Sequence, residues 1–329
     1  MVYKDRLEYY IEKAQQSFHY CPTCQPYDSG DIVWILGIQT SMIEYLECLK
    51  IPKKYWNDVA SSLLCPNCGA SLDVSTDVGL KSPYEIEQEK FIEKLYRSWY
   101  KNYEIQFNEF FEYLEKYPYL GLANKFGKKI KKFISELTPI KIENQSWYRA
   151  REVKSSELLS TNDLYPPDPN DVSISEGRFN HFGQQVFYLS ETEDCAIKEV
   201  LDKDGIAWIQ KFKINKITNI IDLSPDHTNT PSNDISVIAF GLIYIGALYK
   251  PVKRTNGWKP EYFISRFIAD CLKEKGFNGI VFKSTRHFLN NLVLFNWTKN
   301  NIEAVDKPKI LTFKKNNSTF YFNTDANEL

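Results

Sequence analysis

The stretch from Gly177 to Val200 reads Gly-Arg-Phe-Asn-His-Phe-Gly-Gln-Gln-Val-Phe-Tyr-Leu-Ser-Glu-Thr-Glu-Asp-Cys-Ala-Ile-Lys-Glu-Val. Two glycines bound its first part, so we expect a loop over residues 177–183. The apolar run at 186–189 predicts a strand, and residues 192–201 predict a helix. A loop, a strand and a helix in direct succession indicate a domain that mixes helices with a sheet.

Further short apolar runs surround this stretch in the second half of the chain. They predict strands at 206–209, 220–223, 279–282 and 292–295. Residues 260–275 predict another helix, which Gly276 ends. Turn signals such as Pro166-Pro167-Asp168-Pro169 separate the runs. The pattern favours an α+β domain over residues 141–329.

Residues 1–140 have a different character. Apolar residues at helical spacing predict helices at 4–18, 31–49, 52–64, 82–117 and 122–137. The fourth helix has the clearest start, because Ser82 can cap it, Pro83 suits its first turn and Glu85 can complete a capping box. The character changes after Pro139. We therefore expect a mostly helical N-terminal domain, residues 1–140, followed by the α+β domain.

The overall charge of the chain is close to neutral. Its formal net charge is −1, so no global attraction to nucleic acids or to membranes is expected. No apolar run approaches the roughly 20 residues that a membrane span needs. The charged N-terminal segment lacks the apolar core of a signal peptide. We expect a cytoplasmic protein, in which the seven cysteines stay reduced.

Four of the cysteines form two pairs with C-x₂-C spacing, Cys21/Cys24 and Cys65/Cys68, which are separated by 40 residues. Each pair can direct two thiolates from one tight turn at the same ion, and four thiolates suit tetrahedral Zn²⁺. We predict a structural zinc site at these four residues, as part of a zinc knuckle. A nucleic-acid-binding zinc ribbon is the alternative interpretation. Catalysis by this ion is not expected, because a closed Cys₄ site has no open coordination position.

The other three cysteines, Cys48, Cys195 and Cys271, lie on segments that are expected to be helical. They are most simply interpreted as buried core thiols.

Polar side chains in the second half have the chemistry of a nucleotide site. Arg149 and Arg178 are cations that can bind a pyrophosphate through paired hydrogen bonds. Tyr188 ends a predicted strand and can stack on an aromatic ring. Glu199, on the next helix, can hold a ribose hydroxyl. A carboxylate in that position stabilises the cation that forms when a glycosidic bond breaks.

Ser284 and Asn291 flank the last two predicted strands and can add short polar contacts. All six residues also have plainer interpretations. An arginine on a strand is commonly in a surface ion pair, a tyrosine on an apolar strand packs in the core, and a glutamate on a helix is solvated. The serine and the asparagine would then be turn residues. The residue types alone leave both interpretations open.

Seven short motifs occur in order between residues 145 and 297. They are Arg149-Ala150-Arg151, Gly177 through Gly183, Tyr188-Leu189-Ser190, Ala196 through Val200, Tyr262 through Arg266, Gly276 through Ser284, and Asn291 through Phe295. This order resembles the RES domain family, which is named for an arginine, a glutamate and a serine. The match is most specific over residues 177–200. It departs from the family pattern at Ser265-Arg266, where Thr-Gln is common.

The resemblance implies an ADP-ribosyltransferase-like domain, with a mixed or antiparallel β core and flanking helices. Family members are toxins that deplete NAD⁺ by hydrolysis or phosphorolysis, usually checked by a cognate antitoxin. NAD⁺ is therefore the expected substrate. An antitoxin or inhibitor protein is the expected partner. A structural Zn²⁺ is the expected metal, with no metal needed for the chemistry.

The resemblance also assigns roles. Glu199, Arg178 and Ser284 match the catalytic residues, with Glu199 stabilising the ribosyl cation. Arg149 and Arg178 are implied to bind the pyrophosphate. Tyr188 matches a tyrosine that faces the nicotinamide. Ser284 is implied to orient the nicotinamide ribose or amide, and Asn291 is a further implied contact to NAD⁺.

The first half is similar to an N-terminal region that is fused to some RES domains and is called HEPN/RES N-terminal. The similarity rests on the cysteine pairs and on Pro118-Tyr119-Leu120-Gly121 before a lysine-rich helix. HEPN ribonucleases need an arginine a few residues before a histidine. None of the four histidines in this sequence has an arginine four to six positions before it. We expect this domain to be non-catalytic.

Two other functions are compatible with the sequence. The same fold can transfer ADP-ribose to a macromolecule, or the chain can be a non-catalytic zinc-ribbon protein that binds nucleic acid. The presence of Arg149, Arg178, Glu199 and Ser284 favours an enzyme that cleaves NAD⁺. The sequence does not distinguish water from phosphate as the acceptor.

Overall fold

The computed structural model describes residues 3–25, 27–28, 31–154, 158–170, 174–201, 203–224, 259–287, 289–313 and 320–322. The chain divides into two compact units, Met1–Phe91 and Ile92–Leu329. Each unit is described by itself.

The first unit is a small α+β unit around one apolar core. Its elements are α1 (Tyr3–Gln15), η1 (Pro22–Cys24), β1 (Tyr27–Asp28), β2 (Asp31–Ile32), β3 (Ile38–Thr40), α2 (Met42–Cys48), η2 (Lys53–Tyr55), α3 (Trp56–Ser62) and β4 (Val78–Leu80). Strands β1 and β2 pair antiparallel, as do β3 and β4. Fully buried side chains include Phe18, Leu46 and Val59.

The helix expected at residues 31–49 begins only at Met42, and the prediction was wrong for residues 31–41. Ser41 caps α2 by accepting a hydrogen bond from the backbone N–H of Glu44, whose carboxylate accepts one from the backbone of Ser41. This capping box fixes the helix start. Cys48 is exposed rather than buried, because it lies on the outer face of the same helix.

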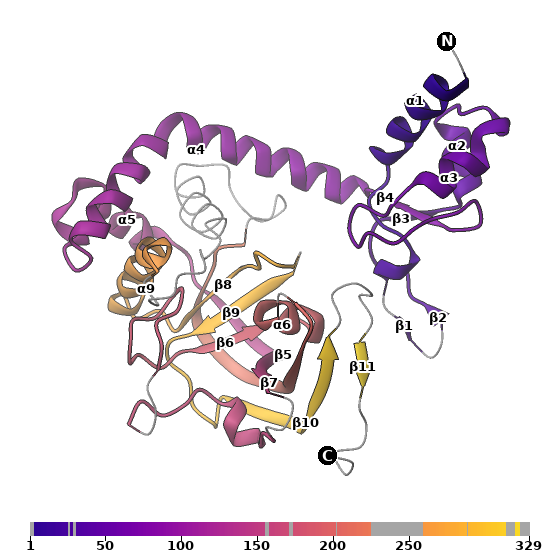
Figure 1. Ribbon diagram of the computed structural model, residues 1–329. Helices are drawn as coiled ribbons and strands as arrows, with labels where there is room; N and C mark the ends of the chain where they lie inside the picture. The colour runs from indigo at the N-terminus through magenta and orange to yellow at the C-terminus, as the bar shows by residue number, and fades with distance from the viewer. Residues whose placement is uncertain are drawn as a thin grey trace. The chain divides into compact units, whose positions relative to one another are not determined.

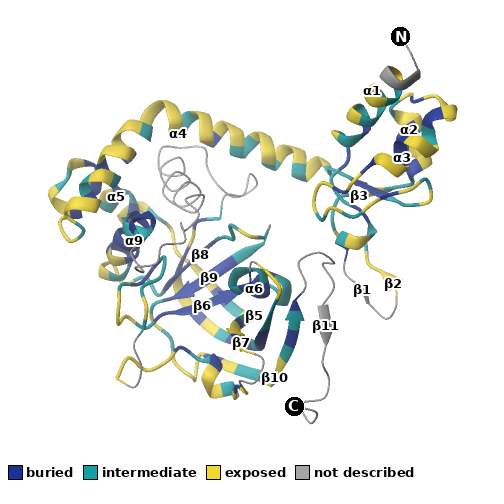
Figure 2. Ribbon diagram, in the orientation of Figure 1, coloured by how far each residue is buried: buried dark blue, intermediate teal, exposed yellow. Residues whose placement is uncertain are grey.

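Helix α4 (Pro83–Lys116) begins in the first unit and continues into the second. Its predicted capping box is present: Ser82 N donates to Glu85 Oε2 at 2.7 Å, and Glu85 N donates to Ser82 Oγ at 3.2 Å. The helix ends two residues before Pro118, as expected. Its buried side chains recur every three or four residues (Figure 2). They are Leu95, Trp99, Tyr103, Phe107, Phe110 and Leu114.

Three helices of the second unit, α4, α5 and α9, pack on one another through aromatic rings. Besides the second part of α4, the helices of this unit are η3 (Gly121–Ala123), α5 (Lys125–Glu136), η4 (Thr161–Leu164), α6 (Glu193–Val200), η6 (Pro260–Tyr262) and α9 (Phe263–Glu274). The Phe110 ring on α4 meets Phe126 of α5 and Phe267 of α9 edge-on, with centroids 5.9 and 5.2 Å apart. The second part of α4 and α5 therefore belong to the same compact unit as the sheet. The division of the chain into units lies within α4, whereas the predicted domain boundary at residue 140 coincides with the start of β5.

The described strands of the second unit form one mixed sheet of seven strands (Figure 1). They are β5 (Ile140–Val153), β6 (Phe187–Ser190), β7 (Gly205–Asp222), β8 (Gly279–Lys283), β9 (Asn290–Leu294), β10 (Ile302–Phe313) and β11 (Phe320–Phe322). Their order is β11-β10-β7-β5-β6-β9-β8, with an additional parallel pairing of β8 to the far end of β7. All other pairings are antiparallel. The predicted α+β fold with a mixed sheet and flanking helices is confirmed.

Strand β7 holds the sheet together. Its residues up to Ile220 pair with β5, and residues 220–222 pair with β8. The strands β7, β5, β6, β9 and β8 thus close into a ring. The two short strands expected at 206–209 and 220–223 are the two ends of this one long strand. Among the helices that the structure describes, none combines the length and the apolar character of a membrane span.

We expect Phe212→Ala to lower the free energy of unfolding of the second unit by about 3–5 kcal/mol. Phe212 is fully buried on β7, and its ring centroid lies 5.0 Å from those of Tyr165 and Phe187. Urea unfolding followed by circular dichroism measures the change. Ile105→Ala is the control, because Ile105 on α4 is 73% exposed. Equal effects of the two substitutions would contradict the placement of Phe212 in the core.

Candidate functional site

A cavity of about 380 Å³ opens on the second unit. Strands β5, β6, β8 and β9, helix α6, the short helix η6 with the residue before it, and the loops at 177–178 and 285–286 supply its wall. The predicted residues at the wall are Arg149, Arg178, Tyr188, Glu199 and Asn291. The sixth, Ser284, makes a hydrogen bond to Glu199. The structure therefore brings all six predicted residues together, although they are spread over more than 140 positions of the sequence.

Glu199 lies in the last turn of α6. Its Oε1 accepts hydrogen bonds from Ser284 Oγ at 2.5 Å and from Asn291 Nδ2 at 2.7 Å. In the described part of the chain, these two side chains donate to the same carboxylate oxygen of Glu199. The carboxylate is thereby held in one orientation, and Oε2 is left for a ligand in the cavity.

The hydroxyl of Ser284 can only donate toward Glu199. It accepts hydrogen bonds from the backbone N–H groups of Arg286 at 3.0 Å and of His287 at 2.9 Å. A hydroxyl has two acceptor lone pairs and one proton. Because both lone pairs are used, the proton points to the carboxylate. Ser284 therefore orients Glu199.

Asn291 is oriented from the opposite side. It lies opposite Ser190 in the β6–β9 register, and Ser190 Oγ donates to its Oδ1 at 2.7 Å. This bond places the amide oxygen toward Ser190 and the amide nitrogen toward Glu199. Cys195 also lies against Oδ1, and burial raises the pKa of its thiol to about 12. Cys195 is thus a neutral core thiol near pH 7, as expected.

Arg149 is the most deeply placed cation of the site. Its Nη1 atom is buried and has no hydrogen-bond partner among the described residues. Burial lowers the pKa of Arg149 to about 10, and the nearby charge of Arg151 adds to the effect. The guanidinium therefore stays protonated near pH 7, with its Cζ atom 5.3 Å from the centroid of the Phe187 ring. A buried cation without an acidic partner favours an anionic ligand.

Several charged or aromatic residues at the wall, among them Tyr262, Lys259 and Arg286, were not assigned roles from the sequence. The Tyr262 ring centroid lies 5.3 Å from Cζ of Arg178. Lys259 lines the cavity, and its Nζ donates to the carbonyl of Glu176. Arg286 donates from Nη1 to the carbonyls of Lys198 and Glu199, at the carboxyl end of α6.

The hydroxyl group of Tyr188 makes hydrogen bonds to the loop that carries Arg178. Its hydroxyl accepts from the backbone N–H of Phe179 at 2.9 Å and donates to Asn180 Oδ1 at 3.0 Å. Burial raises the pKa of this phenol above its usual value, so the phenol stays protonated. Tyr188 therefore fixes the loop that carries Arg178. Its predicted contact with a nicotinamide ring stays a prediction.

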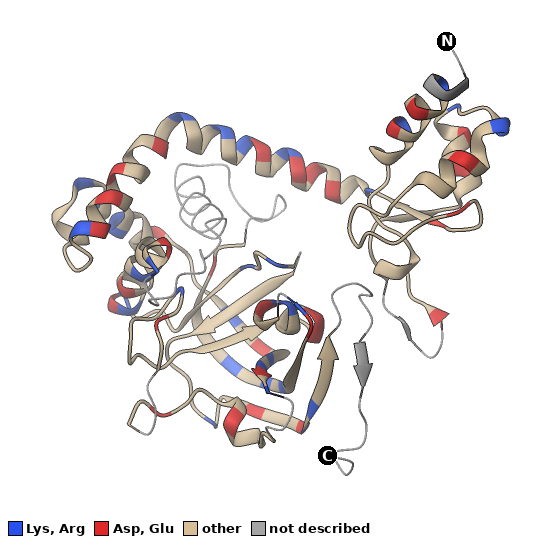
Figure 3. Cartoon of the chain, in the orientation of Figure 1, with Lys and Arg blue, Asp and Glu red and all other residues tan. Residues whose placement is uncertain are grey.

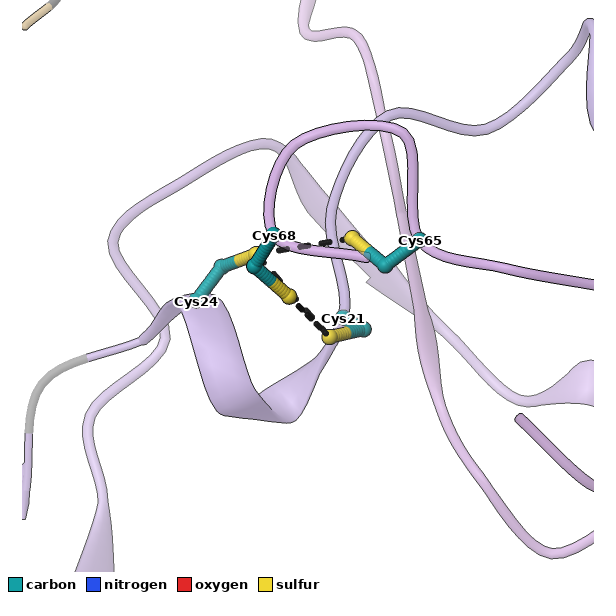
Figure 4. Close-up of side chains that lie close together, drawn as sticks. All are labelled: Cys21, Cys24, Cys65 and Cys68. Atoms are coloured by element: carbon teal, nitrogen blue, oxygen red, sulfur yellow. Dashed lines mark hydrogen bonds between the residues drawn. The ribbon is translucent and has the colours of Figure 1, made fainter. Parts of the chain in front are cut away.

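The four paired cysteines come together in the first unit (Figure 4). Their sulfurs all lie within 4.8 Å of one another. The Cys21–Cys68 and Cys24–Cys65 sulfur separations are 3.5 Å, and the Cys21–Cys24 separation is 3.9 Å. Tetrahedral Zn²⁺ with its usual bond length requires sulfurs about 3.8 Å apart. The geometry therefore fits a Cys₄ metal site.

The comparison with protein families finds a match to the RES domain over residues 146–316, slightly more than half of the chain. The chain belongs to the RES domain family. Every residue of the cavity wall lies within the matched segment. The similarity of residues 1–140 to the HEPN/RES N-terminal region, and the predicted domain boundary, stay predictions.

The chain also resembles a protein of known structure. One similar chain comes from the crystal structure of the M. tuberculosis MbcT–MbcA toxin–antitoxin complex. It shares 9% sequence identity, with a TM-score of 0.37, and the match covers 56% of this chain and 92% of that chain. At this TM-score the likeness adds nothing to the family assignment. No curated protein matches the chain.

We expect Gly177→Ala to disrupt the cavity wall. A Cβ at this position would lie 2.4 Å from Asn180 Oδ1 and 2.8 Å from the Tyr188 hydroxyl oxygen. Asn180 cannot retreat easily, because it is buried and its amide donates to the carbonyls of Ser175, His181 and Gln184. We expect a lower melting temperature and loss of anion binding, measured by differential scanning fluorimetry with pyrophosphate.

The matched control is Gly205→Ala. The nearest atom to a Cβ there is the flexible end of the Leu201 side chain, at 2.8 Å. Near-normal behaviour of Gly177→Ala would show that the loop is not packed as described.

Proposed function

We propose that the RES domain of this chain binds NAD⁺ in the cavity and cleaves the bond between nicotinamide and ribose. The observation that carries the proposal is the fixed carboxylate of Glu199, with one oxygen left over, in a wall that otherwise supplies cations. The described wall contributes four cations, Arg149, Arg178, Lys259 and Arg286, against this one carboxylate. That charge pattern suits a pyrophosphate, which carries two negative charges, joined to a ribose.

We assign a role to each of the six residues. Arg149 and Arg178 bind the pyrophosphate. Tyr188 packs against the nicotinamide, and Oε2 of Glu199 accepts a hydrogen bond from a hydroxyl of the nicotinamide ribose. Ser284 and Asn291 act by holding Glu199 in the orientation that this requires.

Cleavage breaks the bond between C1′ of the ribose and the ring nitrogen of nicotinamide. The electron pair of that bond moves to the nitrogen, which neutralises the pyridinium charge, and nicotinamide leaves. The ribose is left as an oxocarbenium-like cation, which the nearby carboxylate stabilises. Water or phosphate then forms the new bond to C1′, and water loses one proton in doing so.

An activity of this kind depletes NAD⁺, so we propose that the protein acts as a toxin or defence effector. An antitoxin or inhibitor protein would then be its partner. Transfer of ADP-ribose to a macromolecule uses the same first step and differs only in the acceptor.

We expect Glu199→Gln to lower the rate of nicotinamide release by at least 100-fold, because the developing cation loses its counter-charge. Nicotinamide release from NAD⁺ is measured with and without phosphate. Dependence on phosphate would identify it as the acceptor, and radiolabel from NAD⁺ on a protein or nucleic-acid band would identify transfer instead. Full activity of Glu199→Gln would refute this mechanism.

Glu193→Gln is the matched control for this substitution. Glu193 lies on the same helix in a half-exposed ion pair with Lys309, at 3.6 Å. Such pairs contribute little to stability. We expect this variant to release nicotinamide at the wild-type rate.

We also propose that the four paired cysteines bind one structural Zn²⁺. The thiolates of Cys21, Cys24, Cys65 and Cys68 would occupy all four tetrahedral positions, so the ion would stabilise the first unit and take no part in catalysis. An alternative role in nucleic-acid binding is not favoured by the charges. Along α4, which begins in the first unit, glutamates outnumber lysines and arginines (Figure 3).

We expect the purified chain to contain one zinc per molecule by mass spectrometry of the metal. Cys24→Ser should remove most of it and lower the melting temperature, and a strong chelator should do the same to the wild type. Cys48→Ser is the control, since Cys48 is exposed and stands outside the cluster. A metal content unchanged by Cys24→Ser would exclude this site.

A further inference from the structure

Arg178 stands on a segment without regular structure. Residues 174–180 belong to neither a helix nor a strand. Arg149, in contrast, is fixed by the pairing of β5 with β7, where it lies opposite Gln210. The position of Arg178 therefore depends on side chains that reach this segment from other elements.

Two neighbouring side chains of α9 hold three successive residues of the segment. Ser265 Oγ donates to the carbonyl of Arg178 at 2.7 Å. Arg266 Nε donates to the carbonyl of Gly177 at 3.0 Å, and its Nη1 lies 2.7 Å from Glu176 Oε2. Both side chains are almost completely buried, with Ser265 4% and Arg266 2% exposed. Buried polar groups that face a loop backbone fix its position strongly.

A third residue on the same helical face contacts the guanidinium of Arg178. Tyr262, Ser265 and Arg266 are spaced by three and four positions, which places them side by side. The Tyr262 ring centroid lies 5.3 Å from Cζ of Arg178 and 5.7 Å from Cζ of Arg266. One face of the start of α9 thus contacts both the backbone and the charged end of Arg178.

Arg266 does not replace Arg178 as a ligand for an anion. Its charge is balanced by Glu176 within the protein. Arg178 lines the cavity, whereas Arg266 is not among the residues of its wall. The two arginines therefore have different tasks.

We propose that Ser265 and Arg266 are positioning residues, which hold the backbone of residues 176–178 so that Arg178 is presented to the anion in the cavity. The proposal rests on the proposed function in one respect, namely that the anion is the pyrophosphate of NAD⁺.

A double-mutant cycle on the full chain tests this coupling. Inorganic pyrophosphate is titrated by calorimetry into the wild type, Ser265→Ala, Arg178→Ala and the double variant. We expect Ser265→Ala to weaken binding about tenfold, the loss typical of one hydrogen bond. When Arg178 is already alanine, the substitution Ser265→Ala should not lower the affinity for pyrophosphate any further, because Ser265 acts through Arg178. Equal losses in both backgrounds would overturn the proposal.

Two further measurements distinguish a positioning role of Ser265 from a general disruption of the structure. Ser265→Thr keeps the hydroxyl and should bind pyrophosphate nearly as the wild type does, and a loss equal to that of Ser265→Ala would also overturn the proposal. In NAD⁺ turnover we expect Ser265→Ala to raise KM with little change in kcat. A proportional loss of kcat in Ser265→Ala would assign Ser265 another role.

The two proposals fail in different ways. A wild type that binds pyrophosphate but releases no nicotinamide would refute the proposed function, and the binding cycle would still decide the role of Ser265. A wild type that releases nicotinamide but does not bind pyrophosphate would refute the positioning proposal and leave the proposed function standing.

Discussion

The hydrogen bond from Asn291 to Glu199 is the constraint around which the site is built. It joins β9 to α6, and its direction is set by Ser190 on β6, the strand paired with β9. A slip of one residue in that pairing would turn Asn291 to the opposite face of the sheet and leave the carboxylate without this donor. The register of two short strands therefore determines the orientation of the one acidic group in the described cavity wall.

The fold was predictable where the local signals are strong. The loop, strand and helix of residues 177–200, the capped start of α4 and helix α9 follow from apolar spacing and capping residues. Strands β5 and β10 escaped prediction because most of their positions are not buried. Asp306 also adopts a positive φ angle within β10 at the point where the pairing with β7 shifts, which interrupts the alternation that marks a strand.

The site was predictable from residue types in a known order, and its geometry was not. Arg149, Arg178, Glu199 and Ser284 are chemically suited to NAD⁺ wherever they lie, so the family pattern could select them. Tyr262, Lys259 and Arg286 matter only through what they contact after folding. Their neighbours come from elements up to 88 positions away, which no local pattern contains.

Arg149 links the stability of the domain to what fills its cavity. Its guanidinium has a buried nitrogen that finds no hydrogen-bond partner among the described residues, which costs free energy, and an anion bound beside the guanidinium recovers part of that cost. If the anion is NAD⁺, the enzyme loses its own stabilising ligand as it consumes the pool. The empty protein would unfold more readily and become a better substrate for proteases. Under the proposed function, Arg149 would bind the substrate and would also limit how long the protein survives after the substrate is gone.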